Sequence, residues 1–174
     1  MSRLQRHSSR PLNVASVSSE RIGKLMSNFA PTPFILDEHR YSSVEAFYVS
    51  LKFSDDPKMQ VAIRRVDGKE AKRVGRKSKA TRATYQGREF WLGSPEHHAL
   101  IKRAIRAKLE QNPEVARAFV ATHPRPIIHD TGQPEKSTTA FPATVFTRIL
   151  TELRDELRAT RGSAATSLPA VEQG

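Results

Sequence analysis

Apolar residues recur at intervals of three and four positions in five stretches of the chain, which is the spacing of one face of an α-helix. Several of these stretches begin with residues that favour helix starts, such as Asp56 before Pro57 and Ser94 before Pro95. Gly68 is a natural stop for the second stretch. We therefore predict helices over residues 42–53, from 56 to Gly68, over 94–111, from 112 to 121, and over 142–158.

Shorter apolar segments without helical spacing predict a small β component. Residues 12–17 and 33–36 are expected strands near the start of the chain, and residues 126–129 are a possible third. A length of 174 residues suits one domain with a sizeable core. We expect an α+β fold, predominantly α, in a single compact domain over residues 12–160. A flexible basic segment at 1–11 and a disordered tail at 161–174 would flank it.

The charge of the chain is strongly unbalanced. There are 29 Lys and Arg residues against 18 Asp and Glu residues, which gives a formal net charge of +11. Such an excess favours a polyanionic partner, such as nucleic acid or a phosphorylated ligand. The chain has no cysteine, so disulfides, thiolate metal sites and cysteine nucleophiles are excluded. No apolar run approaches the roughly 20 residues that span a bilayer, and we expect a cytoplasmic protein without a membrane partner.

The predicted helix at residues 42–53 carries an acid and an amine beside its apolar stripe. Glu45 and Lys52 are seven positions apart, about two helical turns, and therefore project in nearly the same direction. Burial and neighbouring charges shift the pKa values of such groups, and enzymes use them as acid, base or nucleophile. A structural alternative is a capping box, in which Ser42 caps the helix and Glu45 bonds a backbone N–H at its start.

Lys108 and Trp91 are further candidates for chemistry. Lys108 falls within the apolar stripe of the helix at 94–111, three positions after Ile105, and a buried amine becomes nucleophilic at neutral pH. Its alternative role is structural, with the aliphatic stem on the stripe and the charged end in water. Trp91, the only tryptophan, could stack on a base or another aromatic ring, or it could belong to the core.

Most of the net charge lies in residues 64–88, which include ten Lys and Arg residues against two acids. This segment either contacts phosphate or forms a solvated surface. Gly75 and Gly87 suggest a mobile loop at its end. The candidate ligands for phosphate or nucleic acid are Arg73, Arg76 and Lys77. The chain contains no GxGxxG or Walker sequence, so no standard nucleotide-binding motif is present.

The segment 129–132, His-Asp-Thr-Gly, follows the predicted strand at 126–129, a place where ligand-binding groups are common. Adjacent His and Asp residues are not spaced as metal ligands, and His97 and His98 on one helix point their rings in different directions. We therefore expect no metal and no cofactor. A serine-hydrolase site is also excluded, because the chain has no G-x-S-x-G sequence.

These sequence motifs, in this order, resemble the NADAR family in a variant, phage-like branch. The family includes riboflavin-intermediate N-glycosidases and enzymes that remove ADP-ribose from guanine in DNA. The resemblance spans roughly residues 12–158. The matching motifs, in chain order, are Ser27-Asn28-Phe29-Ala30-Pro31, Pro33-Phe34-Ile35-Leu36-Asp37, Ser43-Val44-Glu45, Leu51-Lys52-Phe53, Ala71-Lys72 with Gly75, Trp91, Lys108 ahead of Gln111-Asn112-Pro113, Ala121-Thr122, His129 with Gly132, and Ile149-Leu150 before Leu153-Arg154.

The resemblance implies hydrolysis of the bond between a nitrogen and C1 of a ribose that carries phosphate or ADP. The expected reaction is the removal of ADP-ribose from guanine bases in nucleic acid. The catalytic candidates are Glu45, Lys52, Lys108 and Asp130, with Lys52 ahead of Lys108 as the nucleophile. The residues expected to contact the substrate are Asn28, Phe29, Tyr48, Trp91, His129 and Gly132.

The chain departs from the family pattern in three places. Val49 stands where glutamine is usual, Glu38 replaces a turn glycine, and the segment 129–132 replaces the usual Trp-Gly and Asn-x-Leu-Gly motifs. Two alternatives follow: a glycosidase for small phosphorylated intermediates of riboflavin synthesis, or a nucleic-acid-binding module without catalysis. The absence of glutamine at position 49 favours the second alternative. The sequence leaves the oligomeric state open.

Overall fold

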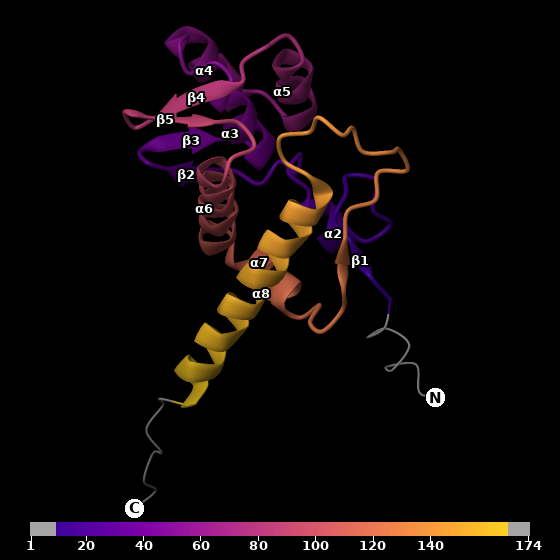
Figure 1. The fold of residues 1–174 in the computed structure, drawn as a ribbon. Helices are drawn as coiled ribbons and strands as arrows, with labels where there is room; N and C mark the ends of the chain where they lie inside the picture. Colours follow the sequence, from indigo (N-terminus) through magenta and orange to yellow (C-terminus); the bar gives the residue numbers. More distant parts are fainter. Residues whose placement is uncertain (1–9, 167–174) are drawn as a thin grey trace, which may run out of the picture.

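Seven helices and three two-stranded sheets make up the part of the chain that the computed structural model describes, residues 10–166 (Figure 1). Strands β1 and β6 pair in parallel, whereas β2–β3 and β4–β5 are antiparallel hairpins. In chain order the elements are β1 (Leu12–Asn13), α2 (Arg21–Met26), β2 (Phe34–Leu36), β3 (His39–Tyr41), α3 (Val44–Leu51), α4 (Pro57–Arg65), α5 (Gly68–Gly75), β4 (Arg82–Tyr85), β5 (Arg88–Trp91), α6 (Pro95–Gln111), α7 (Pro113–Val120), β6 (Ile127–Ile128) and α8 (Ala143–Thr166).

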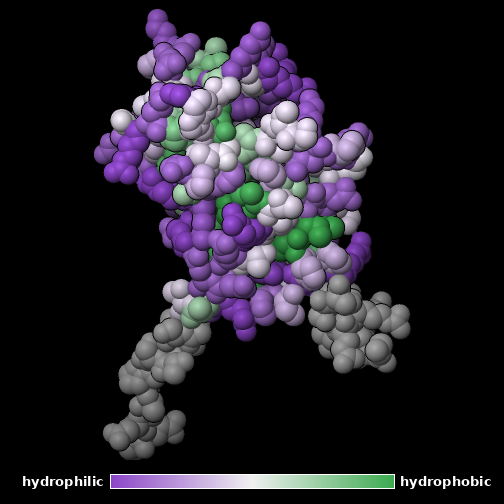
Figure 2. All heavy atoms as spheres, in the orientation of Figure 1, coloured by the Kyte–Doolittle hydropathy of each residue, from purple (hydrophilic) through white to green (hydrophobic). Residues whose placement is uncertain are grey.

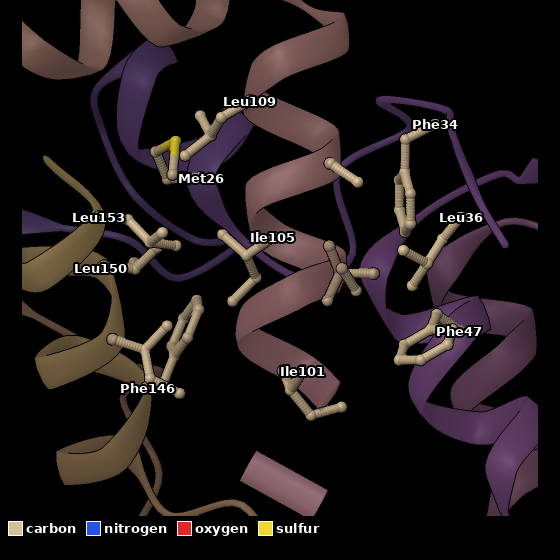
Figure 3. Close-up of a cluster of buried hydrophobic side chains, with 14 of the residues drawn as sticks. Met26, Phe34, Leu36, Phe47, Ile101, Ile105, Leu109, Phe146, Leu150 and Leu153 are labelled. Atoms are coloured by element: carbon tan, nitrogen blue, oxygen red, sulfur yellow. The ribbon is translucent and has the colours of Figure 1, made fainter. Parts of the chain in front are cut away.

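Helix α6 runs through the hydrophobic core (Figure 3). Its residues Ile101, Ile105 and Leu109 lie between two groups of buried side chains. Because these three residues pack between the two groups, α6 joins the two halves of the core. Burying each side chain of this size contributes roughly 1.5–3 kcal/mol to stability. Met26, Phe146, Leu150 and Leu153 lie on the side of α2 and α8, and Phe34, Leu36 and Phe47 lie on the side of β2 and α3.

Both antiparallel hairpins close with two-residue turns in which each residue has a positive φ. The residues are Asp37 (47°) and Glu38 (66°) in the β2–β3 hairpin, and Gln86 (50°) and Gly87 (76°) in the β4–β5 hairpin. Turns of this type match the twist of paired strands and favour glycine, asparagine or aspartate. Glu38 therefore keeps the two-residue turn but occupies a backbone conformation that glycine adopts more easily.

Replacing Glu38 with glycine should raise the free energy of unfolding by about 1 kcal/mol, because a residue with a Cβ atom is disfavoured by roughly that amount in the left-handed region. Urea denaturation followed by circular dichroism measures the change. Glu38→Ala is the matched control, since alanine removes the carboxylate but keeps the Cβ atom, and it should show no such gain. A glycine variant no more stable than the alanine variant would argue against strain at this turn.

The five predicted helices are present as α3, α4, α6, α7 and α8, and the fold is α+β with helices predominant. The expected strand at 33–36 is confirmed by β2, and the one at 126–129 by the two residues of β6. The expected strand at 12–17 is wrong beyond its second residue. Strand β1 is Leu12–Asn13, and the N–H of Val14 makes one more hydrogen bond, to the carbonyl of Ile128 in β6. The chain then turns at Ala15, whose carbonyl accepts from the N–H of Ser18.

Residues 64–88 form the end of α4, helix α5, a connection over residues 76–81, strand β4 and its turn. Part of the loop expected between Gly75 and Gly87 is therefore a strand, and the mobility of the remaining connection stays a prediction. Gly68 begins α5 instead of ending α4, which stops at Arg65. The reason is local: Asp67 caps α5 by accepting from the N–H groups of Lys69 and Glu70 at 2.8 and 2.9 Å. Helix α2 and strands β3 and β5 are further elements that the apolar pattern did not predict.

The structure describes only parts of the two flexible segments expected at the ends of the domain. Residues 1–9 of the expected flexible segment lie outside the described residues, while Arg125 donates hydrogen bonds to the carbonyls of Arg10 and Pro11. Helix α8 continues to Thr166, past residue 161 where we expected the tail to begin, and residues 167–174 lie outside the described residues. Within residues 10–166, no helix has both the length and the apolar character to cross a membrane.

Candidate active site

Helix α3 carries Glu45 and Tyr48, and Lys52 caps its C-terminal end, all at the spacing of one helical face. Ser43 caps the helix, since its hydroxyl accepts from the N–H of Ala46 at 3.1 Å. The capping box headed by Ser42 is therefore not formed; the hydroxyl of Ser42 instead donates to the carbonyl of Val66. In the described part of the chain the Glu45 carboxyl forms no hydrogen bond, so it is not used to cap the helix.

The Glu45 carboxyl is held in an environment that disfavours its charge. The residue is 9% exposed, and burial raises the pKa of its carboxyl from 4.5 to about 7. The positive charge of Lys72 lowers this pKa, as does that of Lys52, but burial outweighs both. A carboxyl with a pKa near neutrality can both give and take a proton at physiological pH, which is what general acid–base catalysis requires.

Lys52 follows the last residue of α3, and its amine lies against Tyr48. Nζ is 4.9 Å from the centroid of the Tyr48 ring. Burial lowers the pKa of Lys52, while the charge of Glu45 raises it. Burial also raises the pKa of Tyr48 to about 12, so its hydroxyl stays protonated at neutral pH. An amine with a lowered pKa beside a carboxyl is suited to nucleophilic attack on a carbon atom.

Helix α5 adds a second lysine, Lys72, that the sequence did not assign to the site. A Cβ atom on Gly68 would lie 2.6 Å from the Phe29 Cα, and one on Gly75 would lie 2.9 Å from a methyl group of Val49. These glycines allow α5 to lie close to α3 and to the loop before β2. Nζ of Lys72 is therefore 4.9 Å from the centroid of the Phe29 ring, and its charge acts on Glu45.

Asn28 completes the group of polar residues around Glu45. Its backbone carbonyl accepts from the N–H of Glu45 at 2.9 Å. Its side-chain Oδ1 is buried and has no hydrogen-bond partner among the described residues. A buried acceptor without a partner costs free energy, so this atom is available to a ligand hydroxyl. We refer to Asn28, Phe29, Glu45, Tyr48, Lys52 and Lys72 as the Glu45 cluster.

A buried histidine that the sequence did not indicate lies next to the Glu45 cluster. The ring centroid of Tyr48 is 5.4 Å from that of His97 and 6.4 Å from that of Phe141. Nδ1 of His97 accepts from the N–H of Gly93 at 3.0 Å, so Nε2 carries the hydrogen, and it has no partner in the described residues. Burial lowers the pKa of His97 to about 4, so the ring is neutral at pH 7.

Comparison with known proteins identifies the family. The sequence model of the bacteriophage protein GP30.3 family matches residues 21–155, which is most of the chain. The chain belongs to this family. GP30.3 is a NADAR-like family, so the resemblance to NADAR proteins in a phage-like form is confirmed. No curated protein matches the chain significantly.

The fold is also similar to that of a solved protein. The NMR structure of the E. coli protein YbiA has a TM-score of 0.60 and 22% sequence identity, and the match covers 89% of this chain and 87% of YbiA. Similarity at this level of identity establishes the fold. The match to the GP30.3 family includes every residue of the Glu45 cluster.

Lys108, the second candidate nucleophile, binds the backbone of the segment next to the Glu45 cluster. It is 1% exposed and donates hydrogen bonds to the carbonyls of Leu25 at 2.6 Å and Ser27 at 3.2 Å. Burial lowers the pKa of its amine to about 7. Ser27 immediately precedes Asn28, so Lys108 holds the segment that carries Asn28 and Phe29 of the Glu45 cluster. The structure thus gives Lys108 a positioning role, and its charged end does not reach water.

Near pH 10.5, where burial of the Lys108 amine no longer costs stability, replacing Lys108 with methionine should lower the free energy of unfolding by about 2–4 kcal/mol. Methionine keeps the aliphatic stem but leaves two buried carbonyls without a donor, and each such loss costs roughly 1–3 kcal/mol. Urea denaturation measures the effect. Lys102→Met on the same helix is the control, because Lys102 forms partly exposed ion pairs with Glu152 and Glu156 that are worth about 1 kcal/mol or less. Equal stabilities of the two variants would argue against the positioning role.

Trp91 lies on β5 and is 55% exposed, so it is not a core residue. The guanidinium carbon of Arg82 is 3.9 Å from the centroid of its ring, and Arg82 is also paired with Glu89 at 2.7 Å. In the described residues no contact joins Trp91 to the Glu45 cluster. An exposed indole can still stack on a base of a bound ligand, so its substrate contact stays a prediction.

The segment 129–132 contributes one residue to the surroundings of the Glu45 cluster. Burial lowers the pKa of His129, the charge of Glu135 raises it, and the charge of Lys72 lowers it, so His129 is within electrostatic range of Lys72. Asp130 and Gly132 lie instead in an exposed turn, where the Asp130 carboxylate accepts from the N–H of Gly132 at 2.8 Å. The structure therefore brings His129 toward the site, but it does not join Asp130 or Gly132 to Glu45.

The three expected phosphate ligands lie on helix α5 or directly after it. Arg73 is bound to both carboxylate oxygens of Glu70, at 2.6 and 2.7 Å. Arg76 and Lys77 are exposed and form no ion pair within the described residues. The residue of α5 whose charge acts on Glu45 is Lys72.

Val49 does not remove a polar group from the Glu45 cluster. It is 1% exposed and lies in a small apolar cluster with Ala46, Ile63 and Ala71, against Gly75. A glutamine at this position would have to bury its amide between α3 and α5. Valine instead supports the close contact of α5 that brings Lys72 to Glu45, so its presence carries little weight for the non-catalytic alternative.

Two cavities of about 650 and 390 Å³ open around the β2–β3 hairpin. Glu38, His39 and Arg64 line both of them, and no residue of the Glu45 cluster lines either. The Glu45 cluster is therefore distinct from these cavities.

Proposed function

We propose that this protein is an N-glycosidase that removes ADP-ribose from guanine bases in nucleic acid. The observation that carries the proposal is the buried Glu45 carboxyl, with a pKa of about 7, beside two lysines from different helices. Membership of a NADAR-like family supports a glycosidase. The net charge of +11 favours a nucleic-acid substrate over a small metabolite, because it attracts polyanions more strongly.

The Glu45 cluster provides a group for each part of such a substrate. Lys72 is a cation at its edge and would bind a phosphate or the diphosphate, together with Arg76 and Lys77 farther along the chain. The Asn28 Oδ1 atom is an acceptor without a partner within residues 10–166 and suits a ribose hydroxyl. The ring of Tyr48 would lie along the sugar or the base. These assignments leave Glu45 and Lys52 free for the reaction at C1.

The reaction can proceed through two imines. Glu45 takes the proton of the exocyclic N–H and gives it to the ring oxygen, so the C1–O bond of the ring breaks and the glycoside opens to a C1 imine. The neutral amine of Lys52 adds to C1, Glu45 moves a proton from the lysine nitrogen to the guanine nitrogen, and the C1–guanine bond breaks to leave an imine between C1 and Lys52. Water then adds to the lysine imine, the C1–lysine bond breaks, and free ADP-ribose and the Lys52 amine are regenerated. The sum is the addition of one water molecule across the C1–N bond.

An assay on parallel substrates tests the proposal. Purified protein is incubated with an oligonucleotide that contains ADP-ribosylated guanine and, separately, with the early phosphorylated intermediates of riboflavin synthesis. Mass spectrometry identifies the products. We expect ADP-ribose and the unmodified oligonucleotide from the first substrate. Release from the riboflavin intermediates alone would retain the glycosidase but assign it a metabolite as substrate.

The same assay separates an enzyme from a nucleic-acid-binding module. Salt-dependent binding of DNA by the wild type, without release of base or ADP-ribose from any substrate, would contradict the proposed function and favour the module.

A further inference from the structure

A basic groove lies beside the proposed active site. The cavity of about 650 Å³ opens between the β2–β3 hairpin and helix α4. Its lining includes His39 and Arg40 from β3, and Arg64 and Arg65 from the end of α4, with Glu38 as the one acid among the lining residues. We refer to this cavity as the arginine groove. Figure 2 shows the end of the molecule that carries α4 and the hairpins covered mostly by hydrophilic residues.

Two of the three arginines in the groove form no ion pair within the described protein, and the third lies against an aromatic ring. Arg40 and Arg65 are exposed, and neither forms an ion pair with a described residue. The guanidinium carbon of Arg64 is 5.5 Å from the centroid of the Tyr41 ring, and its Nε atom is buried without a hydrogen-bond partner in the described residues. Unpaired guanidinium groups gathered in one cavity are suited to binding phosphate oxygens, often in pairs of hydrogen bonds.

The arginine groove continues directly from the Glu45 cluster along the backbone. Phe29 belongs to the cluster, and Pro31 lines the groove, so their Cα atoms are no more than about 7.6 Å apart. On the other side, Ser42 lines the groove three positions before Glu45. Pro33 and Val61 add apolar surface between the arginines. The two sites are therefore within the reach of neighbouring nucleotides of one strand, since phosphates of a strand recur at intervals of several Å.

We propose that the arginine groove binds the phosphodiester backbone of the nucleic-acid strand whose modified base occupies the Glu45 cluster. The inference rests on the proposed function and adds the surface that holds the rest of the substrate. Arg40 and Arg65 contact phosphates, and the apolar surface of Pro31 and Val61 packs against the sugars. A small phosphorylated riboside occupies only the Glu45 cluster and leaves the groove empty. The groove thus selects nucleic acid over a metabolite.

Nucleic acid fits the arginine groove better than an acidic peptide does. Guanidinium groups bind phosphate through two parallel hydrogen bonds, and the groove presents three of them with a net positive charge. A bound peptide gains specificity from side chains anchored in a well-packed pocket, whereas the apolar part of this groove consists of two prolines and one valine. A strand with a repeating phosphate charge and apolar sugar faces satisfies both features.

Binding of a short fluorescent single-stranded oligonucleotide tests the proposal by anisotropy over a range of salt concentrations. The variant is Arg40→Ala combined with Arg65→Ala, which removes two exposed side chains. We expect affinity to fall at least about tenfold at low salt. The slope of log affinity against log salt concentration should decrease in magnitude by about 1.4, the value expected for the loss of two phosphate contacts on a single strand. The matched control, Arg117→Ala with Arg148→Ala, removes two exposed arginines from α7 and α8 and should bind as the wild type does.

Unchanged affinity and salt slope in the groove variant would overturn the proposal. A wild type that binds a polyglutamate peptide as tightly as the oligonucleotide would also overturn it, because the groove would then recognise negative charge alone. If the double variant unfolds, the single Arg65→Glu variant, checked by its thermal melting curve, gives the same comparison. That variant should weaken oligonucleotide binding more than Arg117→Glu does, and equal effects of the two would again count against the groove.

Catalysis gives a second readout that separates the groove from the proposed function. In the groove variant the ratio of kcat/KM on the modified oligonucleotide to kcat/KM on free ADP-ribosylguanosine should fall at least about tenfold relative to wild type. If the wild type cleaves neither substrate, the proposed function fails, and the binding experiment still decides whether the groove holds nucleic acid. An unchanged ratio in an active enzyme overturns the groove and leaves the proposed function standing.

Discussion

Replacing Glu45 with glutamine should slow glycosidic hydrolysis at least about a hundredfold and, at pH 8, stabilise the folded protein by roughly 3 kcal/mol. General acid–base catalysis by a positioned carboxyl is worth about 10²–10⁴ in rate. The gain in stability arises because the wild type must hold a carboxylate in a buried site at this pH. A shift of the pKa from 4.5 to about 7 corresponds to a free energy of about 3 kcal/mol.

The stability difference should depend on pH in one direction. Well below pH 4.5 the Glu45 side chain is protonated in both the folded and the unfolded chain, and the two proteins should be nearly equally stable. As the pH rises through 4.5 toward 7, the unfolded wild type loses its proton first, so the wild type loses stability. Glutamine has no proton to lose. Urea denaturation of both proteins across this range measures the difference.

Glu114→Gln is the matched control for the Glu45 variant, because the Glu114 side chain is 91% exposed on α7 and lies 4.0 Å from its partner Arg117. It should change neither the rate nor the stability by a measurable amount. A Glu45→Gln protein that is fully active would remove Glu45 from the chemistry. One that is less stable than the wild type at pH 8 would show that the carboxylate is not disfavoured by burial.

Replacing Lys52 with arginine should lower the rate at least about a hundredfold and abolish a covalent intermediate. Arginine keeps the positive charge but does not lose its proton in proteins, so it cannot form an imine with C1. Reduction of the reacting mixture with cyanoborohydride should attach the ribose of the substrate to Lys52 in the wild type. Mass spectrometry of peptides locates the attachment.

Lys72→Arg is the control for Lys52→Arg, since Lys72 is assigned the role of a cation that arginine can also fulfil. It should retain activity within about tenfold of the wild type. An adduct on Lys108 would show that Lys108, and not Lys52, is the nucleophile. The structure argues against this outcome, because the Lys108 amine is buried against the carbonyl of Ser27. Full activity of Lys52→Arg would exclude an imine at this position.

Local patterns predicted the helix that carries Glu45. Val44, Phe47 and Leu51 are all buried, as the helical spacing of apolar residues indicated, and Glu45 and Lys52 interact through their charges. Only the cap differs, with Ser43 in place of Ser42. These features depend on residues within two turns of each other, which is the range over which hydrophobic spacing is informative.

Features that depend on contacts between distant segments were not predictable from such patterns. From the sequence, Gly68 was predicted to end a helix and Gly75 to begin a mobile loop. In the structure these two glycines instead allow α5 to approach Phe29 and Val49. The position of Lys72 follows from that approach. A glycine permits either a turn or close packing, and the sequence alone does not say which one applies.

The hydrogen-bond partners of Lys108 were likewise not predictable from the local pattern. The apolar stripe correctly indicated that the residue is buried, and it offered two roles, a nucleophile or a stem with its amine in water. The structure shows a third arrangement, in which the amine donates to the carbonyls of Leu25 and Ser27. Those carbonyls come from the end of α2, a helix of six residues too short for its pattern to be recognised.

The ionisation of Glu45 is the property on which the proposed chemistry depends most directly. An NMR titration of the Glu45 side-chain carboxyl in ¹³C-labelled protein measures it, with Glu45→Gln used to assign the resonance. We expect a midpoint near pH 7, and a higher one in Lys72→Met, because the charge of Lys72 lowers the pKa of this carboxyl. A midpoint near 4.5 that does not respond to Lys72→Met would contradict a buried acid coupled to that lysine.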